Sequence, residues 1–591
     1  MPKTAENEKL PQWDLSDLYS APDAPEIEKD FVRAESLSTD FASKYQGKLA
    51  GITGDVLAQA IADYEVITEI LYKAMSYAQL LYAADVSDGE KGRFYQTTQE
   101  RVTDISTATL FFRLELNRLE DNVLAKQLES GTAAHFGPWI RDVRAFRAHQ
   151  LSDELEKLLH EKSVSGRAAW VRLFDETEAA LRFPLDGKDM SMSDVLNMMS
   201  DKDAKQRKKA AKVLGKVLGQ NIKLFSLVTN TLAKDKSIED GWRSYPRPIS
   251  ERNLSNQVED DVVDALVSSV QDSYPELSHR YYRLKAGWFG VDALDYWDRN
   301  APLPGDENRL YGWEDARKTV LDAYGKFDPK LAEIADQFFD KRWIDAELRE
   351  GKDSGAFSHS TVPSVHPYIL MNFHGKARDV MTLAHELGHG VHQVLSGPQG
   401  TLMADTPLTT AETASVFGEM LTFRSLLDGE DDPARRRILL AGKVEDMLNT
   451  VVRQIAFHTF ETRVHDERSG GELSPERLGD IWMDVQGESL GDGIRFDDDY
   501  RSYWAYIPHF VHSPFYVYAY AFGDCLVNSL YDVFQGGHPG FQGKYLDMLS
   551  AGGTRRHKEL LAPFGLDASD PTFWKRGLGI VAGFVDELEK I

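Results

Sequence analysis

Two histidines and a glutamate stand at a spacing that can bind and use a metal ion. Residues 385–389 read His-Glu-Leu-Gly-His, inside a stretch from Ala377 to Leu395 that is predicted to be helical. Residues four apart share one face of a helix, so His385 and His389 can both offer an imidazole nitrogen to one zinc ion. Zinc lowers the pKa of a bound water, and Glu386 can take a proton from that water as general base. The pattern therefore predicts metal-assisted hydrolysis.

The third protein ligand decides the subclass of such a site. A metzincin carries another histidine six residues after the second one, and that position is Leu395. His392 lies seven residues beyond the first motif histidine, which is about 10 Å along a helix axis, so it cannot join the other two on one zinc ion. Glu412 is better placed, in a second predicted helix at 409–419. The loop 396–408, with its glycines and prolines, lets that helix return beside the first.

Glu419 lies two helical turns after Glu412, on the same face of the predicted helix. A carboxylate there could accept a hydrogen bond from a ligand histidine and fix its tautomer. Spacing alone supports an ordinary surface carboxylate equally well.

Helices are predicted to supply most of the framework around these residues. The stretch Ala204–Leu218 is rich in helix formers, and we interpret its basic cluster as a solvated helix face rather than a site for an anionic partner. Strand signals are few. Phe183–Met192 contains the turn pair Asp186-Gly187 and predicts a hairpin. Val365–Phe373, rich in β-branched and aromatic residues, is the best candidate strand.

Domain boundaries are faint in this sequence. The turn-rich segment near 183–194 predicts a division into an N-terminal helical domain, 1–190, and a catalytic domain, 191–591. The loop 300–306, with two prolines and a glycine, indicates another break.

Composition excludes several classes of partner. The 591 residues include 68 basic and 94 acidic side chains, a formal charge of −26, which disfavours nucleic acid and anionic lipid. The one cysteine, Cys525, permits neither an internal disulfide nor a cysteine-based zinc site. The first ten residues are polar, and no apolar run reaches the length of a membrane span. We therefore expect a cytoplasmic protein, and we leave its oligomeric state open, a monomer included.

Several segments together resemble one known family. HELGH, followed after 22 residues by ETASVFGE, is similar to the M3 family of zinc peptidases, in its oligoendopeptidase F branch. WIDAELREGKDSGAFS (343–358) and PYILMNFHG (367–375) resemble the branch's approach to the active site. IPHFVHSPFYVYAYAFG (507–523) resembles its substrate-binding segment, and WDLSDLY (13–19) its opening. The resemblance runs nearly end to end.

The resemblance implies one zinc ion per chain, bound by His385, His389 and Glu412, with Glu386 as general base. It implies a mainly α fold in which two lobes enclose a deep channel, with a small sheet beside the HELGH helix. The edge strand of that sheet, expected at 367–373, would pair with a peptide backbone. The activity implied is that of an endopeptidase for short peptides.

The same resemblance implies that His509 and Tyr518 bind the substrate carbonyl or stabilise the oxyanion. His512 and Tyr516 are implied as further substrate-binding residues, and Tyr520 competes for the tyrosine role. Spacing alone fits a packed aromatic helix at least as well.

Two alternatives come from other classes of protein. An aminopeptidase with the same two histidines would have a glutamate 19 or 20 residues after His389, where this chain has Leu408 and Thr409. A non-catalytic peptide-binding protein would be expected to have lost a ligand or the base, and all four residues are present.

Overall fold

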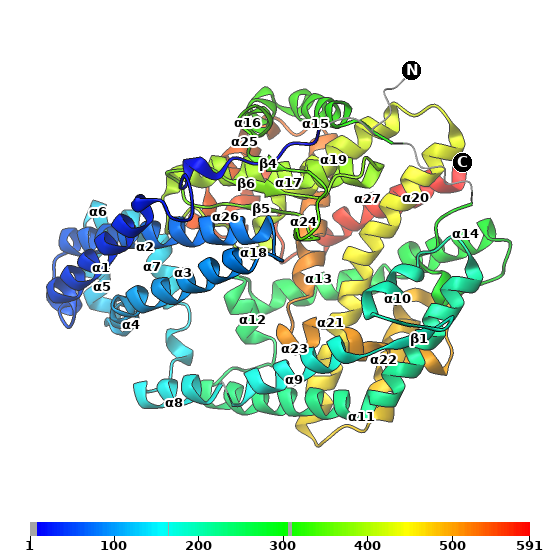
Figure 1. The fold of residues 1–591 in the computed structure, drawn as a ribbon, viewed down its shortest axis with the longest axis horizontal. Coiled ribbons are helices and arrows are strands. Elements are labelled where there is room, and N and C mark those ends of the chain that lie inside the picture. Colours follow the sequence, from blue (N-terminus) through cyan, green and yellow to red (C-terminus); the bar gives the residue numbers. More distant parts are fainter. Residues whose placement is uncertain (1–8, 164, 305–309) are drawn as a thin grey trace. The chain divides into compact units, whose positions relative to one another are not determined.

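The computed structural model describes residues 9–163, 165–304 and 310–591. The chain divides into two compact units, each built from three separate stretches. Unit 1 comprises Met1–Arg147, Asn308–Gly429 and Gly537–Gly565, and unit 2 comprises Ala148–Glu307, Glu430–Gly536 and Leu566–Ile591. Helices dominate both units, and the strands among the described residues are two or three residues long (Figure 1). The prediction of a mainly α protein is confirmed.

The predicted boundary at residue 190 falls inside unit 2. The division into 1–190 and 191–591 stays a prediction about the sequence, because a compact unit need not be one continuous segment of chain.

Unit 1 is a set of helices around one small sheet. Its helices and strands are α1 (Pro25–Tyr45), α2 (Gly54–Ala83), α3 (Gly89–Thr107), α4 (Leu110–Arg118), α5 (Asp121–Gln127), α6 (Gly131–His135), α7 (Gly137–Arg144), α15 (Trp313–Phe327), α16 (Pro329–Asp340), β4 (Ile344–Asp345), β5 (Phe357–His359), β6 (Tyr368–Leu370), α17 (Ala377–Ser396), α18 (Leu408–Ala411), α19 (Thr413–Asp428), α25 (Phe541–Leu549) and α26 (His557–Leu561).

The sheet of unit 1 packs against α17, which carries the HELGH motif. Its strand order is β4-β6-β5, with β6 parallel to β4 and antiparallel to β5. β6 lies within the predicted strand Val365–Phe373, and all three of its residues are buried, as their apolar side chains require. The expectation that 367–373 is an edge strand is wrong, because β4 and β5 hydrogen bond to its two sides. The edge positions belong to β4 and β5.

The opening segment of the chain lies against this sheet. The carbonyl oxygen of Pro11 accepts hydrogen bonds from the backbone of residues 346 and 347, and Tyr368 donates its hydroxyl to the carbonyl of Asp14 at 2.9 Å. Trp13 between them is buried. The WDLSDLY segment therefore contributes to the support of the sheet.

Unit 2 is also helical. Its helices and strands are α8 (Asp153–Ser163), α9 (Arg167–Ala180), β1 (Phe183–Leu185), β2 (Lys188–Met190), α10 (Met192–Met198), α11 (Ala204–Arg243), α12 (Ser250–Ser255), α13 (Asp260–Asp272), α14 (Arg280–Trp288), β3 (Leu294–Asp295), α20 (Pro433–Thr450), α21 (Val452–Ser469), α22 (Pro475–Leu490), β7 (Ile494–Arg495), α23 (His509–His512), α24 (Tyr518–Gln535) and α27 (Pro571–Lys590).

The hairpin predicted in unit 2 is present, whereas the predictions for the helix at 204–218 and its basic cluster need correction. β1 and β2 pair antiparallel through Asp186 and Gly187, both at positive φ as a tight hairpin turn requires. The helix predicted at 204–218 is the first part of α11, which continues to Arg243. The basic cluster on it is not simply solvated. Arg207 is buried against Asp298, and Lys212 pairs with two aspartates of the 497–499 segment.

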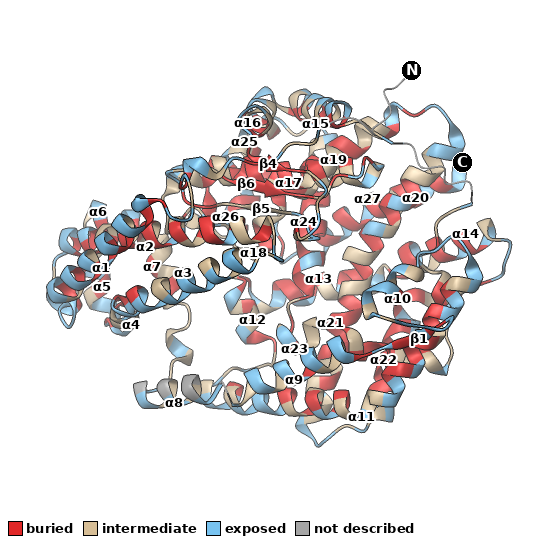
Figure 2. Ribbon diagram, in the orientation of Figure 1, coloured by how far each residue is buried: buried red, intermediate tan, exposed pale blue. Residues whose placement is uncertain are grey.

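The core of unit 2 contains α24, whose residues from Ala521 to Tyr531 are all buried (Figure 2). α24 packs on α27, and the Ser529 hydroxyl of α24 donates a hydrogen bond to the carbonyl of Phe573 in α27 at 2.7 Å. Cys525 lies in this core as a free, buried thiol. In the part of the chain that the structure describes, no helix has the length and apolar character needed to cross a membrane.

Candidate metal centre

Close helix packing in unit 1 brings the two histidines of α17 against the glutamate before α19. Gly388, inside the HELGH motif, makes this packing possible. A Cβ at that position would lie 2.5 Å from the carbonyl oxygen of Ala414 and 2.6 Å from the Cα of Ser415. Any larger residue would push the helices apart. Tyr324 of α15 adds a second tie by donating its hydroxyl to the carbonyl of Ala384.

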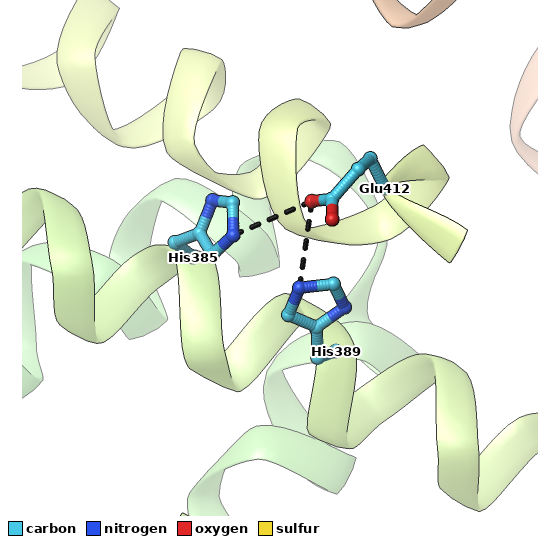
Figure 3. A group of neighbouring side chains, drawn as sticks. All are labelled: His385, His389 and Glu412. Carbon is cyan, nitrogen blue, oxygen red and sulfur yellow. Dashed lines mark ion pairs between the residues drawn. The ribbon is translucent and has the colours of Figure 1, made fainter. Parts of the chain in front are cut away.

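Three potential ligands converge across this helix contact (Figure 3). The Nε2 atoms of His385 and His389 each lie 3.4 Å from Oε2 of Glu412, and the three ligand atoms all lie within 4.8 Å of one another. Ligands about 2.1 Å from a tetrahedral zinc ion are about 3.4 Å apart, so the observed separation fits that ion. Two imidazoles and a carboxylate are also the donor set expected of a hydrolytic zinc site.

Each of the three side chains is held by a neighbour. Glu419 of α19 lies 3.3 Å from Nδ1 of His385, which leaves Nε2 facing the candidate metal position. His389 hydrogen bonds to the backbone carbonyl of Ala411. Ser415 donates its hydroxyl to Glu412 at 2.6 Å. The interpretation of Glu419 as a partner of a ligand histidine is therefore supported over that of a free surface carboxylate.

His392 lies outside the ligand group. Its side chain is buried and hydrogen bonds to the carbonyl of Ala411, and burial lowers its pKa to about 4. It packs the end of the motif helix, in agreement with the exclusion drawn from the helix rise.

Glu386 is buried beside the ligand group and is not part of it. Burial is the main cause that raises the pKa of its carboxyl to about 7, and the charge of Glu412 acts in the same direction. A hydrogen bond from the backbone of Ser358 in β5 opposes this shift. The edge strand of the sheet therefore touches the predicted base.

The carboxylates around the ligand group favour a positive charge at its centre. Burial alone would lower the pKa of His385, but the hydrogen bond to Glu419 and the charges of Glu412, Glu386 and Glu419 raise it to about 9. Burial lowers the pKa of His389 to about 4. For Glu412, burial is outweighed by the charges of the two histidines, and its pKa falls below the usual value. The site thus has the electrostatics of a cation site.

The remaining predicted site residues belong to unit 2. His509 begins α23, and its Nε2 lies 3.2 Å from the hydroxyl of Tyr520. The ring of Tyr516 lies beside both, with centroids 6.2 Å from His509 and 5.3 Å from Tyr520. His509, Tyr516 and Tyr520 form what we call the histidine–tyrosine group.

Tyr518 and His512 have other surroundings. Tyr518 is fully buried, and its hydroxyl accepts a hydrogen bond from Asn256 at 2.9 Å. His512 pairs with Asp175 at 2.6 Å. These contacts favour Tyr520 or Tyr516 over Tyr518 for the tyrosine role, and the contacts of His509 favour it for the histidine role. The assignment of these residues to substrate binding stays a prediction.

Sequence reasoning missed two supporting residues. Ser415 follows Glu412 by three residues, a spacing that places a hydroxyl beside the carboxylate in a helical turn. Ser358 follows the segment DSGAF, and nothing in its own spacing pointed to contact with Glu386.

Comparisons with known proteins agree with this geometry. Residues 197–580 match the model of Peptidase family M3, and residues 115–183 match that of Oligopeptidase F. Oligopeptidase PepF of Bacillus subtilis is 27% identical, over 100% of this chain and 88% of its own length. An oligoendopeptidase F homolog of Lactococcus lactis subsp. lactis is 26% identical, over 99% and 97%. The crystal structure of oligoendopeptidase-F from Enterococcus faecium has a similar fold, with a TM-score of 0.72 and 22% identity over 96% and 98% of the two chains.

Proposed function

This chain belongs to peptidase family M3 and is a peptidase, and on that premise we propose that it is a zinc-dependent endopeptidase that cuts internal bonds of short peptides. One observation carries the proposal. His385, His389 and Glu412 converge at tetrahedral ligand spacing beside the buried carboxylate of Glu386. The names of the relatives, oligopeptidase and oligoendopeptidase, support the substrate class.

In the proposed mechanism, zinc supplies a Lewis acid that polarises the scissile carbonyl and acidifies water. Glu386 accepts a proton from the attacking water as the new C–O bond forms. It then delivers that proton to the departing amine as the C–N bond breaks. Burial raises the pKa of this carboxyl, which strengthens it as a base.

In this proposal, other residues orient the metal ligands or donate hydrogen bonds to the oxyanion. Glu419 keeps the ring of His385 oriented, and Ser415 holds the Glu412 carboxylate. We propose that His509 and a tyrosine, Tyr520 before Tyr516, donate hydrogen bonds to the developing oxyanion. His512 and Tyr518 then have supporting roles, because their polar atoms are engaged with Asp175 and Asn256.

We also propose that access limits the substrate to short chains, as the family resemblance implies through a deep channel. A folded domain is too wide for such a channel, and a long unfolded chain gives up conformational entropy for each residue that it confines. A catalytic domain at 191–591, zinc as the resident metal and a cytoplasmic location belong to the same proposal.

The test offers one cleavable sequence in three forms at equal concentration: a free short peptide, a long denatured chain and an exposed loop of a stable protein. Mass spectrometry of the products should show cleavage of the free peptide, weak cleavage of the long chain and none of the loop. Chelation should abolish the activity and added zinc should restore it. Equal cleavage of all three forms would replace an oligopeptidase with a general protease, and full activity after chelation would remove the metal mechanism.

A further inference from the structure

Unit 2 carries a cavity of about 580 Å³ beside the proposed substrate-binding histidine. One wall comes from α21, through Arg453 and Gln454, and continues into Tyr506 and His509. Asp175 and Glu178 of α9 also line the cavity. Of these residues, the metal mechanism proposed above uses only His509. It gives no role to the charged side chains that line the cavity.

Arg453 is a cation without an acidic partner in the described part of the chain. Its side chain stacks on the ring of Phe457 at 5.0 Å, and one nitrogen lies 3.5 Å from the hydroxyl of Tyr506. No carboxylate of the described residues lies within ion-pair distance of its guanidinium. Burial and the charge of Arg299 lower its pKa. The Arg453 side chain is half-buried, and taking an unpaired guanidinium out of water is costly, so such a group is usually matched to an anion.

Gln454 adds unused hydrogen-bonding capacity to the same wall. Its Nε2 donates to the carbonyl of Asn449 at 3.4 Å, while its Oε1 is buried without a partner among the described residues. The last residue of a peptide offers a carboxylate and, on the same residue, a backbone N–H. Arg453 and Gln454 are adjacent in the sequence, and both line this cavity.

Neither Asp175 nor Glu178, the two acidic residues that line the cavity, lies within ion-pair distance of Arg453. Asp175 pairs with His512 at 2.6 Å. Burial and the neighbouring Asp175 raise the pKa of Glu178. His509, on the cationic wall, has its pKa lowered by burial and by neighbouring cations and is a neutral donor or acceptor.

We propose that this cavity is a carboxylate-binding subsite for the peptide substrate, in which Arg453 pairs with the carboxylate, Tyr506 donates to it and Gln454 accepts from the adjoining N–H. The proposal rests on the peptidase function proposed above. The carboxylate can be that of the peptide's C-terminus or that of an acidic side chain, and the contact of Gln454 favours the C-terminus.

The experiment compares matched peptides on the zinc-loaded full chain. One pair differs only in a free C-terminal acid or a C-terminal amide, and a second pair differs only in Glu or Gln at an internal position. A charge-assisted hydrogen bond in a buried site should make kcat/KM about tenfold or more higher for the acid than for the amide. A preference in the second pair instead would identify an acidic side chain as the ligand.

Variants then assign the preference to Arg453. Arg453→Gln should cleave acid and amide alike, and Arg453→Lys should keep part of the preference. Arg463→Gln on the same helix removes an exposed pair with Glu488 and should keep all of it. A merely structural Arg453 would instead lower the rates for both peptides by the same factor. If Arg453→Gln fails to fold, Tyr506→Phe, which keeps the charge, should reduce the preference.

Equal kcat/KM for both pairs in the wild type would overturn the subsite, and so would an unchanged preference in a folded Arg453→Gln variant. Binding of the acid and amide peptides, followed by fluorescence anisotropy, needs no cleavage. It keeps the two proposals separate. Tighter binding of the acid peptide without hydrolysis would contradict the peptidase mechanism and support the subsite. Hydrolysis with no preference for the acid peptide would support the peptidase mechanism and contradict the subsite.

Discussion

The candidate metal centre of unit 1 and the histidine–tyrosine group of unit 2 are built in different ways. In the metal centre each ligand has its own holding contact, from Glu419, Ser415 or the Ala411 carbonyl. In the histidine–tyrosine group Nε2 of His509 lies 3.2 Å from the hydroxyl of Tyr520, a residue that is 37% exposed. A metal site needs fixed distances among its ligands, whereas oxyanion donors can complete their geometry when substrate binds.

The difference also explains what could be read from the sequence. Histidines four apart on an uninterrupted helix have one geometry, so the HELGH ligands followed from spacing. Glu412 followed less directly, because it stands at the junction of α18 and α19. Between His509 and Tyr520 the helix is broken. α23 ends at His512, Phe515 has a positive φ, and α24 begins at Tyr518.

Because the helix is interrupted, helical periodicity does not extend from His509 to the tyrosines. The spacing of the residues therefore could not show which tyrosine lies beside His509. The strand at 365–373 was recognised from its β-branched and aromatic residues, but its central place was not. Its pairing with β4 and β5 depends on hydrogen bonds to distant segments.

The strongest expected effect comes from removing a ligand of the metal centre. Glu412→Ala leaves two imidazoles, too few for tight zinc binding, so both the metal and the activity should be lost. Elemental analysis after dialysis measures the zinc. Asp428→Ala, exposed at the end of the same helix, is the control and should retain zinc. Full occupancy in Glu412→Ala would mean that another residue, Glu419 first, is the ligand.

The next largest effect is expected at Glu386, where a substitution should change turnover without changing zinc binding. Glu386→Gln should keep zinc and lose about 10²–10⁴-fold in kcat, the range for a general base. Zinc content and steady-state kinetics on one peptide give both values. Near-normal turnover by the zinc-replete variant is the result that contradicts the role of Glu386.

A smaller effect is expected in the histidine–tyrosine group. Tyr520→Phe should lower kcat by about 10²-fold, as removal of an oxyanion donor does, with zinc content unchanged. Tyr518→Phe is the matched control. It should cost about 1 kcal/mol of stability through the lost bond to Asn256 and leave kcat unchanged. A large loss of kcat in Tyr518→Phe instead would contradict the assignment of Tyr520 to the oxyanion.

The smallest effect sharpens the role of the holding contacts. Glu419→Gln keeps the shape of the side chain and removes the charge that orients His385. Zinc affinity should fall by about 10–100-fold, the usual range for such partners. Competition with a chelating dye measures the affinity. Ser415→Ala should have a weaker effect of the same kind, and a normal affinity in Glu419→Gln would assign that carboxylate to packing alone.

The alternation of the chain between the units has a consequence for its synthesis. Six stretches alternate between unit 1 and unit 2, so neither unit is complete until late in translation. Tyr545 of α25 donates a hydrogen bond to the carbonyl of Thr413 at 2.8 Å and packs on Phe417, next to the ligand glutamate. At about 5–20 residues per second, the 430–536 stretch takes roughly 5–20 s to be made before α25 follows. During that interval α25 does not yet cover this apolar face of the nascent α19, and the face is open to a chaperone that binds apolar surfaces.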